Sequence, residues 1–137
     1  MDESELKKIW RKNWLSSIQY IASIKDQNQY WIDPEQSNPH WSFVEIMCEY
    51  FDDLNLDKGL ENYVEKGFVS ENEYKLVIKL HNQLDKYEPP NKDEYDHIAI
   101  LKDPTWISIC NEAKRTCKKL LSVLSDQEER KLMYKIN

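Results

Sequence analysis

Large apolar residues recur at steps of three and four along most of the chain, which is the period of an α-helix buried on one side. In the first segment the apolar positions are Leu6, Trp10, Trp14, Ile18, Ile21 and Ile24. Arg11 and several lysines fall on the other faces, and Ser4 and Asp2 are the two candidate N-caps. This pattern predicts an amphipathic first helix.

Residues 26–39 break the helical period, because they are polar, contain two prolines and carry one aromatic island around Tyr30 and Trp31. We predict a loop over 26–39 that Trp31 pins to the core. Asn38 and Pro39 then form a cap and first-turn pair, which predicts the start of a second helix. The apolar row of that helix is Val44, Met47, Cys48, Phe51 and Leu54.

The middle of the chain carries two further helix signals. A short helix around Tyr63 should stop at Gly67, because glycine suits the left-handed residue after a helix. Ser70 and Glu73 match a capping box, in which each side chain bonds to the backbone N–H of the other residue. The apolar stripe that follows is Tyr74, Val77, His81, Leu84 and Tyr87. It predicts a long helix in the centre of the fold.

Two prolines end that helix, and residues 88–94 form a polar connector. Asp103 and Pro104 open a helix whose apolar row is Trp106, Cys110, Ala113, Cys117, Leu120 and Leu124. Ser125 and Glu128 repeat the capping box before a final short helix. Only two glycines are present, which disfavours a fold of many tight hairpins. The 137-residue chain is therefore expected to be all-α, a single-domain helical bundle of about five or six helices.

Acidic residues outnumber basic ones by 25 to 19, and the formal net charge is −6. Nucleic acids and anionic lipid surfaces would be repelled on average, so we expect neither as a partner and favour a partner with a basic surface. The N-terminus lacks the features of a signal peptide, and no apolar run is long enough for a membrane span, which favours a cytoplasmic location. Cys48, Cys110 and Cys117 include no CxxC pair and are expected to be free buried thiols.

One stripe on the second helix, on the face away from its apolar row, consists of Glu45, Glu49, Asp52 and Asp53. Like charges at i, i+4 destabilise a helix by about 0.2–0.5 kcal/mol per pair, and no lysine within this segment offsets them. Asp52 and Asp53 also lie toward the helix C-terminus, where the helix dipole disfavours anions. Two interpretations follow: a solvated helix face, or an acidic face that binds a cationic partner.

Catalytic and metal-binding motifs are weak in this sequence. Glu94 and His97 form one Glu-x-x-His with the spacing of a carboxylate-bridged metal pair, but such sites need a second copy. There is no GxGxxG, P-loop, HExxH or GxSxG motif, and all three cysteines occupy apolar positions, where burial raises a thiol pKa. His81 lies on an apolar stripe, as core histidines do. We therefore expect no enzymatic activity, no metal and no cofactor.

Several short motifs between about residues 10 and 120 resemble a family of short bacterial proteins. They are WLSSI at 14–18, YWI at 30–32, EYFDDL at 49–54, Glu71 with Glu73, Leu84 with Asp85, and DPTW at 103–106. Proteins of this kind resemble immunity proteins of polymorphic toxin systems, which neutralise a toxin by binding it. The resemblance implies a helical, non-enzymatic inhibitor in the cytosol, and it places residues 50–53 in the most recognisable acidic motif of the family.

The first hypothesis is an immunity-type protein that binds a cognate toxin domain, since many toxin domains are nucleases with basic clefts that an acidic inhibitor can enter. The expected partner-binding residues are Glu45, Glu49, Asp52, Asp53, Tyr30 and Trp31. For Trp31 the alternative to an exposed anchor is a core position beneath the loop. The other hypotheses are a structural or homo-oligomeric interaction protein, whose acidic stripe only maintains solubility, and a metal-dependent enzyme. The oligomeric state stays open.

Overall fold

Eight α-helices make up most of a computed structural model that describes residues 2–32 and 42–135. They are α1 (Glu3–Ala22), α2 (Ile24–Tyr30), α3 (Phe43–Cys48), α4 (Glu61–Glu65), α5 (Glu71–Lys86), α6 (His97–Lys102), α7 (Pro104–Leu120) and α8 (Gln127–Tyr134). A π-helical turn, η1 (Glu49–Asp53), continues α3, and two 3₁₀ turns follow at η2 (Leu56–Lys58) and η3 (Pro90–Lys92). The described residues contain no strand, so the all-α expectation is confirmed, with more helices than the five or six predicted.

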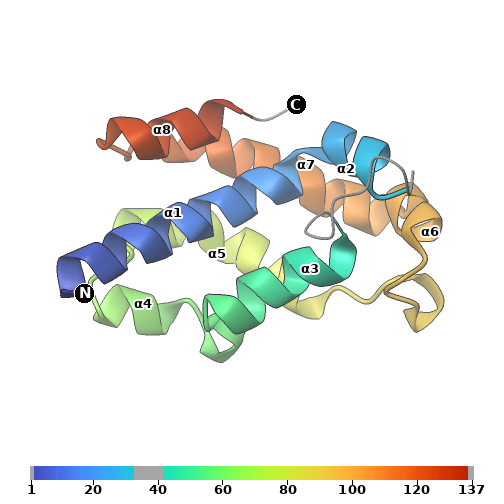
Figure 1. Cartoon of the computed structure of the whole chain (residues 1–137), viewed down its shortest axis with the longest axis horizontal. Coiled ribbons are helices and arrows are strands. Elements are labelled where there is room, and N and C mark those ends of the chain that lie inside the picture. The colour runs from blue at the N-terminus through green and yellow to red at the C-terminus, as the bar shows by residue number, and fades with distance from the viewer. Residues whose placement is uncertain (1, 33–41, 136–137) are drawn as a thin grey trace.

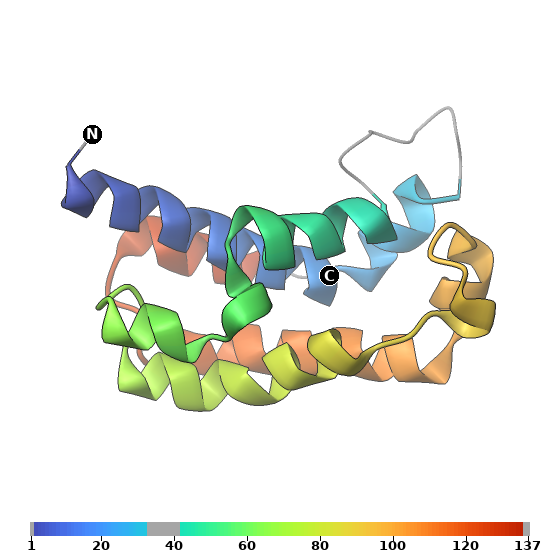
Figure 2. The ribbon, with the colours of Figure 1, turned by 90° about the horizontal axis from the view of Figure 1, so that it is seen from below.

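Helix α1 is the element around which the others are arranged (Figure 1). It packs on α7 and α8, and α5 also packs on α7. The α3–η1 segment runs alongside α1 in the opposite direction, and α4 follows it on the way to α5 (Figure 2). The N-terminal half of α1 therefore lies near α4 and η1, and this placement positions the site described below.

The first predicted helix is broken at Ser23, where φ and ψ leave the helical region. A second helix, α2, then occupies residues that the sequence assigned to the loop 26–39, so that assignment is wrong for 26–30. Gln27 explains the difference. Its buried side-chain amide donates hydrogen bonds to the Tyr20 and Ile21 carbonyls at the end of α1, at 3.0 and 3.1 Å. Its side-chain oxygen accepts a hydrogen bond from the Trp106 indole N–H at 2.9 Å. The two amide contacts add partners to carbonyls in the last turn of α1, and the Trp106 contact joins α2 to α7.

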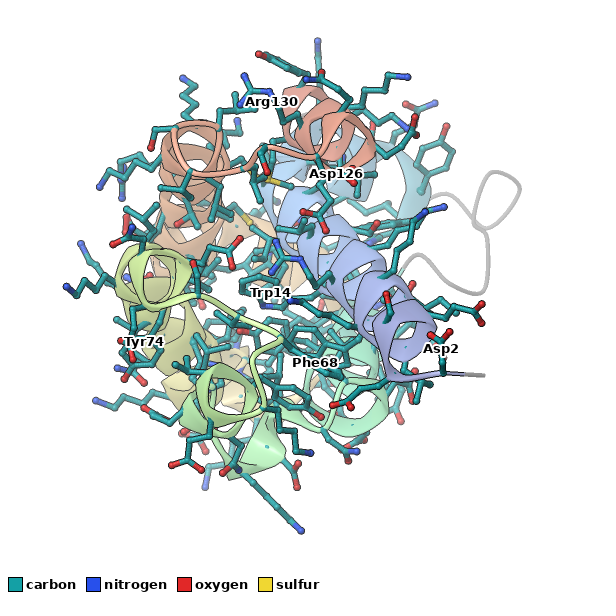
Figure 3. All side chains as sticks on the ribbon, turned by 90° about the vertical axis from the view of Figure 1, so that its left-hand side faces the viewer. Asp2, Trp14, Phe68, Tyr74, Asp126 and Arg130 are labelled. Atoms are coloured by element: carbon teal, nitrogen blue, oxygen red, sulfur yellow. The ribbon has the colours of Figure 1, made fainter. Side chains whose placement is uncertain are left out.

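The core is a single cluster of apolar side chains from seven of the helices and from η1 and η2, and the partly buried Ile24 of α2 packs against it. The row predicted for α7 is confirmed, because Trp106, Cys110, Ala113, Cys117, Leu120 and Leu124 are all buried. Figure 3 looks along the bundle and shows Trp14 and Phe68 between the helices, with Tyr74 and Arg130 toward the outside.

Several predicted helix boundaries agree with the structure. Asp2 caps α1 by accepting a hydrogen bond from the Glu5 backbone N–H at 2.9 Å. The capping box of Ser70 and Glu73 is present at the start of α5, and Gly67 after α4 has the left-handed φ of 77°. Asp103 caps α7 with Pro104 in its first turn. Local sequence signals therefore place these helix ends correctly.

Two other predicted boundaries differ. The final helix is capped by Asp126, which accepts hydrogen bonds from the N–H groups of Glu128 and Glu129, so the predicted capping box of Ser125 and Glu128 is wrong. Both N–H groups bond to one carboxylate oxygen, Oδ1 of Asp126, at 2.9 and 3.0 Å, so the helix starts one residue later than predicted. The Asn38 and Pro39 start signal lies outside the described residues, and α3 has Ser42 as its N-cap.

Arg11 is the most extensively bonded polar side chain in the bundle, although the sequence placed it on a solvent face. Its guanidinium forms a bidentate pair with Glu73, with N–O distances of 2.9 and 2.6 Å, and two hydrogen bonds with Glu129, at 2.9 and 3.0 Å. A fifth bond, at 2.7 Å, goes to the Phe68 carbonyl. All five N–H donors of the side chain are therefore used. We call Arg11, Phe68, Glu73 and Glu129 the Arg11 network; it joins α1, α5 and α8.

Glu73 serves the Arg11 network and the capping box together, because its Oε1 also accepts a hydrogen bond from the Ser70 N–H at 2.9 Å. Burial raises the pKa of Glu73, but the bonds from Arg11 and Ser70 outweigh it and hold the pKa below its usual value of 4.5. This carboxylate stabilises the fold above that pH, and its contribution is lost as the pH falls through the lowered pKa.

Replacing Arg11 with Met should lower the free energy of unfolding by about 3 kcal/mol, because Glu73 and Glu129 would lose a partner in a largely buried position. Lys12→Met, at the exposed position next to Arg11, should change the free energy of unfolding by about 0.5 kcal/mol or less. Urea unfolding followed by circular dichroism measures both variants. Equal stabilities for the two variants would show that the Arg11 network does not hold the helices together.

Candidate functional site

The four predicted acidic residues are carried by α3 and η1 and face outward. Phe43, Ile46 and Tyr50 anchor this segment in the core. Ser42 caps α3 by accepting a hydrogen bond from the Glu45 N–H at 3.0 Å. The exposed carboxylates are Glu45, Glu49, Asp52 and Asp53, which we call the acidic stripe. The four acids are therefore exposed, while Phe43, Ile46 and Tyr50 face the core.

The buried row of the segment is not the predicted one. Of the predicted row, only Leu54 is fully buried, and Cys48 is exposed, so its assignment as a buried thiol is wrong. The row that packs in the core is Phe43, Ile46, Tyr50 and Leu54. Both rows consist mainly of large apolar residues at helical steps, so spacing alone could not distinguish them. Cys110 and Cys117 are buried as predicted, and burial raises the pKa of each thiol to about 12.

The π-helical geometry of η1 affects where the last two acids point. The Leu54 N–H donates to the Glu49 carbonyl at 3.1 Å, a bond that spans one residue more than in an α-helix. The wider turn lets Asp52 and Asp53 both remain exposed while Tyr50 and Leu54 face the core. Two adjacent carboxylates are thus presented together at the end of the acidic stripe.

The carboxylates of the acidic stripe contribute to raised pKa values of two neighbouring side chains. Cys48 lies among the carboxylates, and the pKa of its thiol is raised by partial burial and then by Asp52 and Glu45. On α1, burial raises the pKa of Tyr20 to about 12, with a further contribution from Glu49. A raised thiol pKa lowers the thiolate fraction, so this exposed cysteine is poorly suited to nucleophilic chemistry.

Three carboxylates of the acidic stripe take no part in the ion pairs of the described residues. Across residues 2–32 and 42–135, the ion pairs join Arg11, Lys79, Lys92, Arg115 and Lys131 to carboxylates elsewhere. Glu45, Asp52 and Asp53 take part in none of them. The negative charge of these three carboxylates is therefore available to an external cation.

Tyr50 fixes η1 to α5. Its hydroxyl and Nδ1 of His81 share a buried hydrogen bond of 2.9 Å. Burial lowers the pKa of His81 below its usual 6.5, so the ring is neutral near pH 7. The neutral ring stabilises the fold above pH 6.5, and that contribution is lost as the pH falls through the lowered pKa. His81 is thus a core histidine, as its position on the apolar stripe indicated.

Trp31 does not supply an exposed anchor, because its side chain is only 5% exposed. Its ring centroid lies 6.1 Å from that of Trp106 and 5.5 Å from that of His97. Its carbonyl lies 3.1 Å from Nδ1 of His97. The alternative of a core position is therefore the correct one for Trp31. Tyr30, the last residue of α2, is half-buried.

A groove next to the acidic stripe was missed by the sequence analysis. It has a volume of about 320 Å³ and lies between the start of α1, the end of η1 and α4, with Asp53 in its wall. Leu6, predicted as a core residue, is 50% exposed beside it, and Ile9 is 48% exposed. Helical spacing marked Leu6 as apolar but could not show that the bundle ends before covering it.

Other features of the described residues offer less for chemistry. A larger polar depression of about 580 Å³ borders Arg11, but every donor of that guanidinium is already bonded within the protein. No group of three or more potential metal ligands comes together in the part of the chain that the structure describes, and His97 of the Glu-x-x-His pair contacts Trp31 instead. Within the same residues, no helix is long and apolar enough to cross a membrane.

No family model, curated protein or solved structure matches the chain. The acidic stripe and the adjacent groove are therefore the features from which a function can be inferred, together with the motifs noted in the sequence.

Replacing Trp31 with Ala should lower the free energy of unfolding by about 3–5 kcal/mol, as the loss of a large buried aromatic side chain does. The neighbouring Ile32 is 44% exposed, and Ile32→Ala should change it by about 0.5 kcal/mol. Denaturant titration measures both variants. If the Trp31→Ala protein is as stable as the Ile32→Ala protein, the Trp31 side chain is not buried in the core.

Replacing Tyr50 with Phe should lower the free energy of unfolding by about 1–3 kcal/mol, because Nδ1 of His81 would lose its buried partner. Tyr95 is 72% exposed, so Tyr95→Phe makes the same chemical change where water can replace the hydroxyl contact. Thermal and urea unfolding distinguish the two variants. If Tyr50→Phe is no less stable than Tyr95→Phe, the bond does not fix η1.

Proposed function

We propose that this protein binds a protein partner with a basic surface through the acidic stripe, and that it acts as an immunity-type protein that neutralises a toxin domain by binding. The observation that carries the binding proposal is the exposure of four carboxylates on one segment, of which Glu45, Asp52 and Asp53 make no ion pair within the described residues. Such a surface attracts cationic partners and accelerates their association.

The position of these acids favours binding over solubility alone. Asp52 and Asp53 are adjacent at the end of a helical segment, where the helix dipole disfavours anions. Scattered surface charge would keep the protein soluble without this local repulsion. A cation from a partner would relieve the repulsion, since it would lie within a few ångströms of both carboxylates.

The immunity role is supported by the resemblance of the sequence motifs to immunity proteins of polymorphic toxin systems. Many toxin domains have basic clefts for anionic substrates, and an acidic inhibitor can block such a cleft by occupying it. In this proposal Glu45, Glu49, Asp52 and Asp53 contact the basic surface of the toxin, and Tyr30 stays a candidate contact. The buried Trp31 is not part of the binding surface.

Affinity capture from the native host tests the proposal. The baits are the wild type, a Glu45→Lys/Asp52→Lys variant, and a Glu88→Lys/Glu94→Lys variant that changes the net charge equally. Glu88 and Glu94 are exposed on the connector between α5 and α6. We expect a basic protein to be retained by the wild type and by the connector variant, and to be lost from the stripe variant and at raised salt.

The captured protein should then arrest growth when it is expressed alone and be neutralised by co-expression of the wild type. The Glu45→Lys/Asp52→Lys variant should protect poorly, while the connector variant should protect fully. Recovery of the same proteins by all three baits, or of none, would contradict a binding role for the acidic stripe. A basic partner without toxicity would retain the binding role and overturn the immunity role.

A further inference from the structure

The groove beside η1 has an aromatic floor that is already rigid. The ring of Trp10 stacks on that of Tyr63 with centroids 4.2 Å apart, and Phe68 packs against both, at 5.9 and 5.8 Å. The Trp10 indole N–H donates a hydrogen bond to the Leu54 carbonyl at 3.0 Å, which ties the floor to the end of η1. An apolar side chain that enters this groove would meet a preformed surface.

The walls of the groove expose apolar surface that the fold leaves uncovered. Leu6 and Ile9 project from the first turns of α1 and are 50% and 48% exposed. They lie one helical turn apart, on the same side of α1 as Trp10 and Asn13. Exposed apolar residues gathered at a groove differ from scattered surface residues, because together they offer one continuous contact area.

The groove and the acidic stripe are continuous. Asp53 ends the stripe and also lines the groove, so a partner that contacts the paired carboxylates of η1 reaches the groove without a gap. From Glu45 to Asp53 the segment rises by about 12 Å, or roughly two helical turns. Among the residues that line the groove, the one basic side chain is Lys66, whose Nζ lies over the Tyr63 ring, 5.0 Å from its centroid.

We propose that the groove receives a large apolar side chain from a basic amphipathic segment of the partner, whose lysines or arginines lie along the acidic stripe. This inference rests on the proposed function and specifies the chemistry of its partner. The segment carries cationic residues over about two helical turns and an apolar residue beyond their η1 end. The charges orient the segment, and the apolar residue fixes its register in the groove.

Two synthetic peptides of equal length and charge test this inference with the full chain. Both carry lysines over two helical turns, and one ends in leucines where the other has serines. Amide chemical shifts and titration calorimetry report the site and affinity for the wild type and for Ile9→Glu. The control Ile98→Glu alters a residue that is 52% exposed on α6, at the other end of the bundle.

We expect the leucine peptide to bind the wild type at least tenfold more tightly than the serine peptide, with shifts at Leu6, Ile9 and Asp53. Ile9→Glu should abolish the difference, and Ile98→Glu should retain it. Equal affinities of the two peptides for the wild type would overturn the groove inference. If both peptides then lose affinity for the Glu45→Lys/Asp52→Lys variant, binding through the acidic stripe would still be supported.

Binding of both peptides that is unaffected by Glu45→Lys/Asp52→Lys would instead contradict the proposed function itself. Self-association of the protein gives a further outcome. If the mass of the wild type rises with concentration in sedimentation and Ile9→Glu removes this rise, the groove belongs to a second copy of the chain, and the inference of a basic segment fails.

Discussion

The Arg11 network is the constraint on which the rest of the structure depends. One guanidinium bonds to Glu73 on α5, to Glu129 on α8 and to the Phe68 carbonyl, so it fixes two helices and the segment before α5 against α1 with a single planar group. Buried ion pairs of this kind contribute modestly to net stability but penalise other arrangements, because any misplaced helix leaves a charge unpaired. The bundle is thus specified by a polar contact as well as by its apolar core.

This constraint also determines which surface α1 leaves open. With Arg11 turned toward α5 and α8, the opposite side of the first turns carries Leu6 and Ile9 into solvent, next to Asp53. The hydrogen bond between Tyr50 and His81 on α5 holds η1 beside these first turns of α1. The acidic stripe and the apolar groove are therefore adjacent because two buried polar contacts place the segments that carry them. Among the described residues, Glu45, Asp52 and Asp53 form no ion pair, and Leu6 and Ile9 are about half exposed.

The sequence predicted the features that depend on local physics. Helix periods and caps such as Ser70 and Asp103 depend on residues within one or two turns, and the exposed acids follow from the same period. The features that it missed depend on contacts between distant residues. In the sequence Arg11 resembles a surface residue, because its partners are 57 to 118 positions away. Gln27 on α2 accepts a hydrogen bond from Trp106, which is 79 positions away. The exposure of Leu6 depends on where the bundle ends, which no helical period encodes.

The acidic stripe and its groove form one face, which we propose contacts a basic partner. Carboxyl-group labelling of the captured complex tests it most directly, because each exposed Asp and Glu reports its own accessibility. Glu45, Asp52 and Asp53 should become protected on binding, while Glu88 and Glu94 stay reactive. Unchanged labelling of the acidic stripe in a complex that protects carboxylates elsewhere would contradict the account.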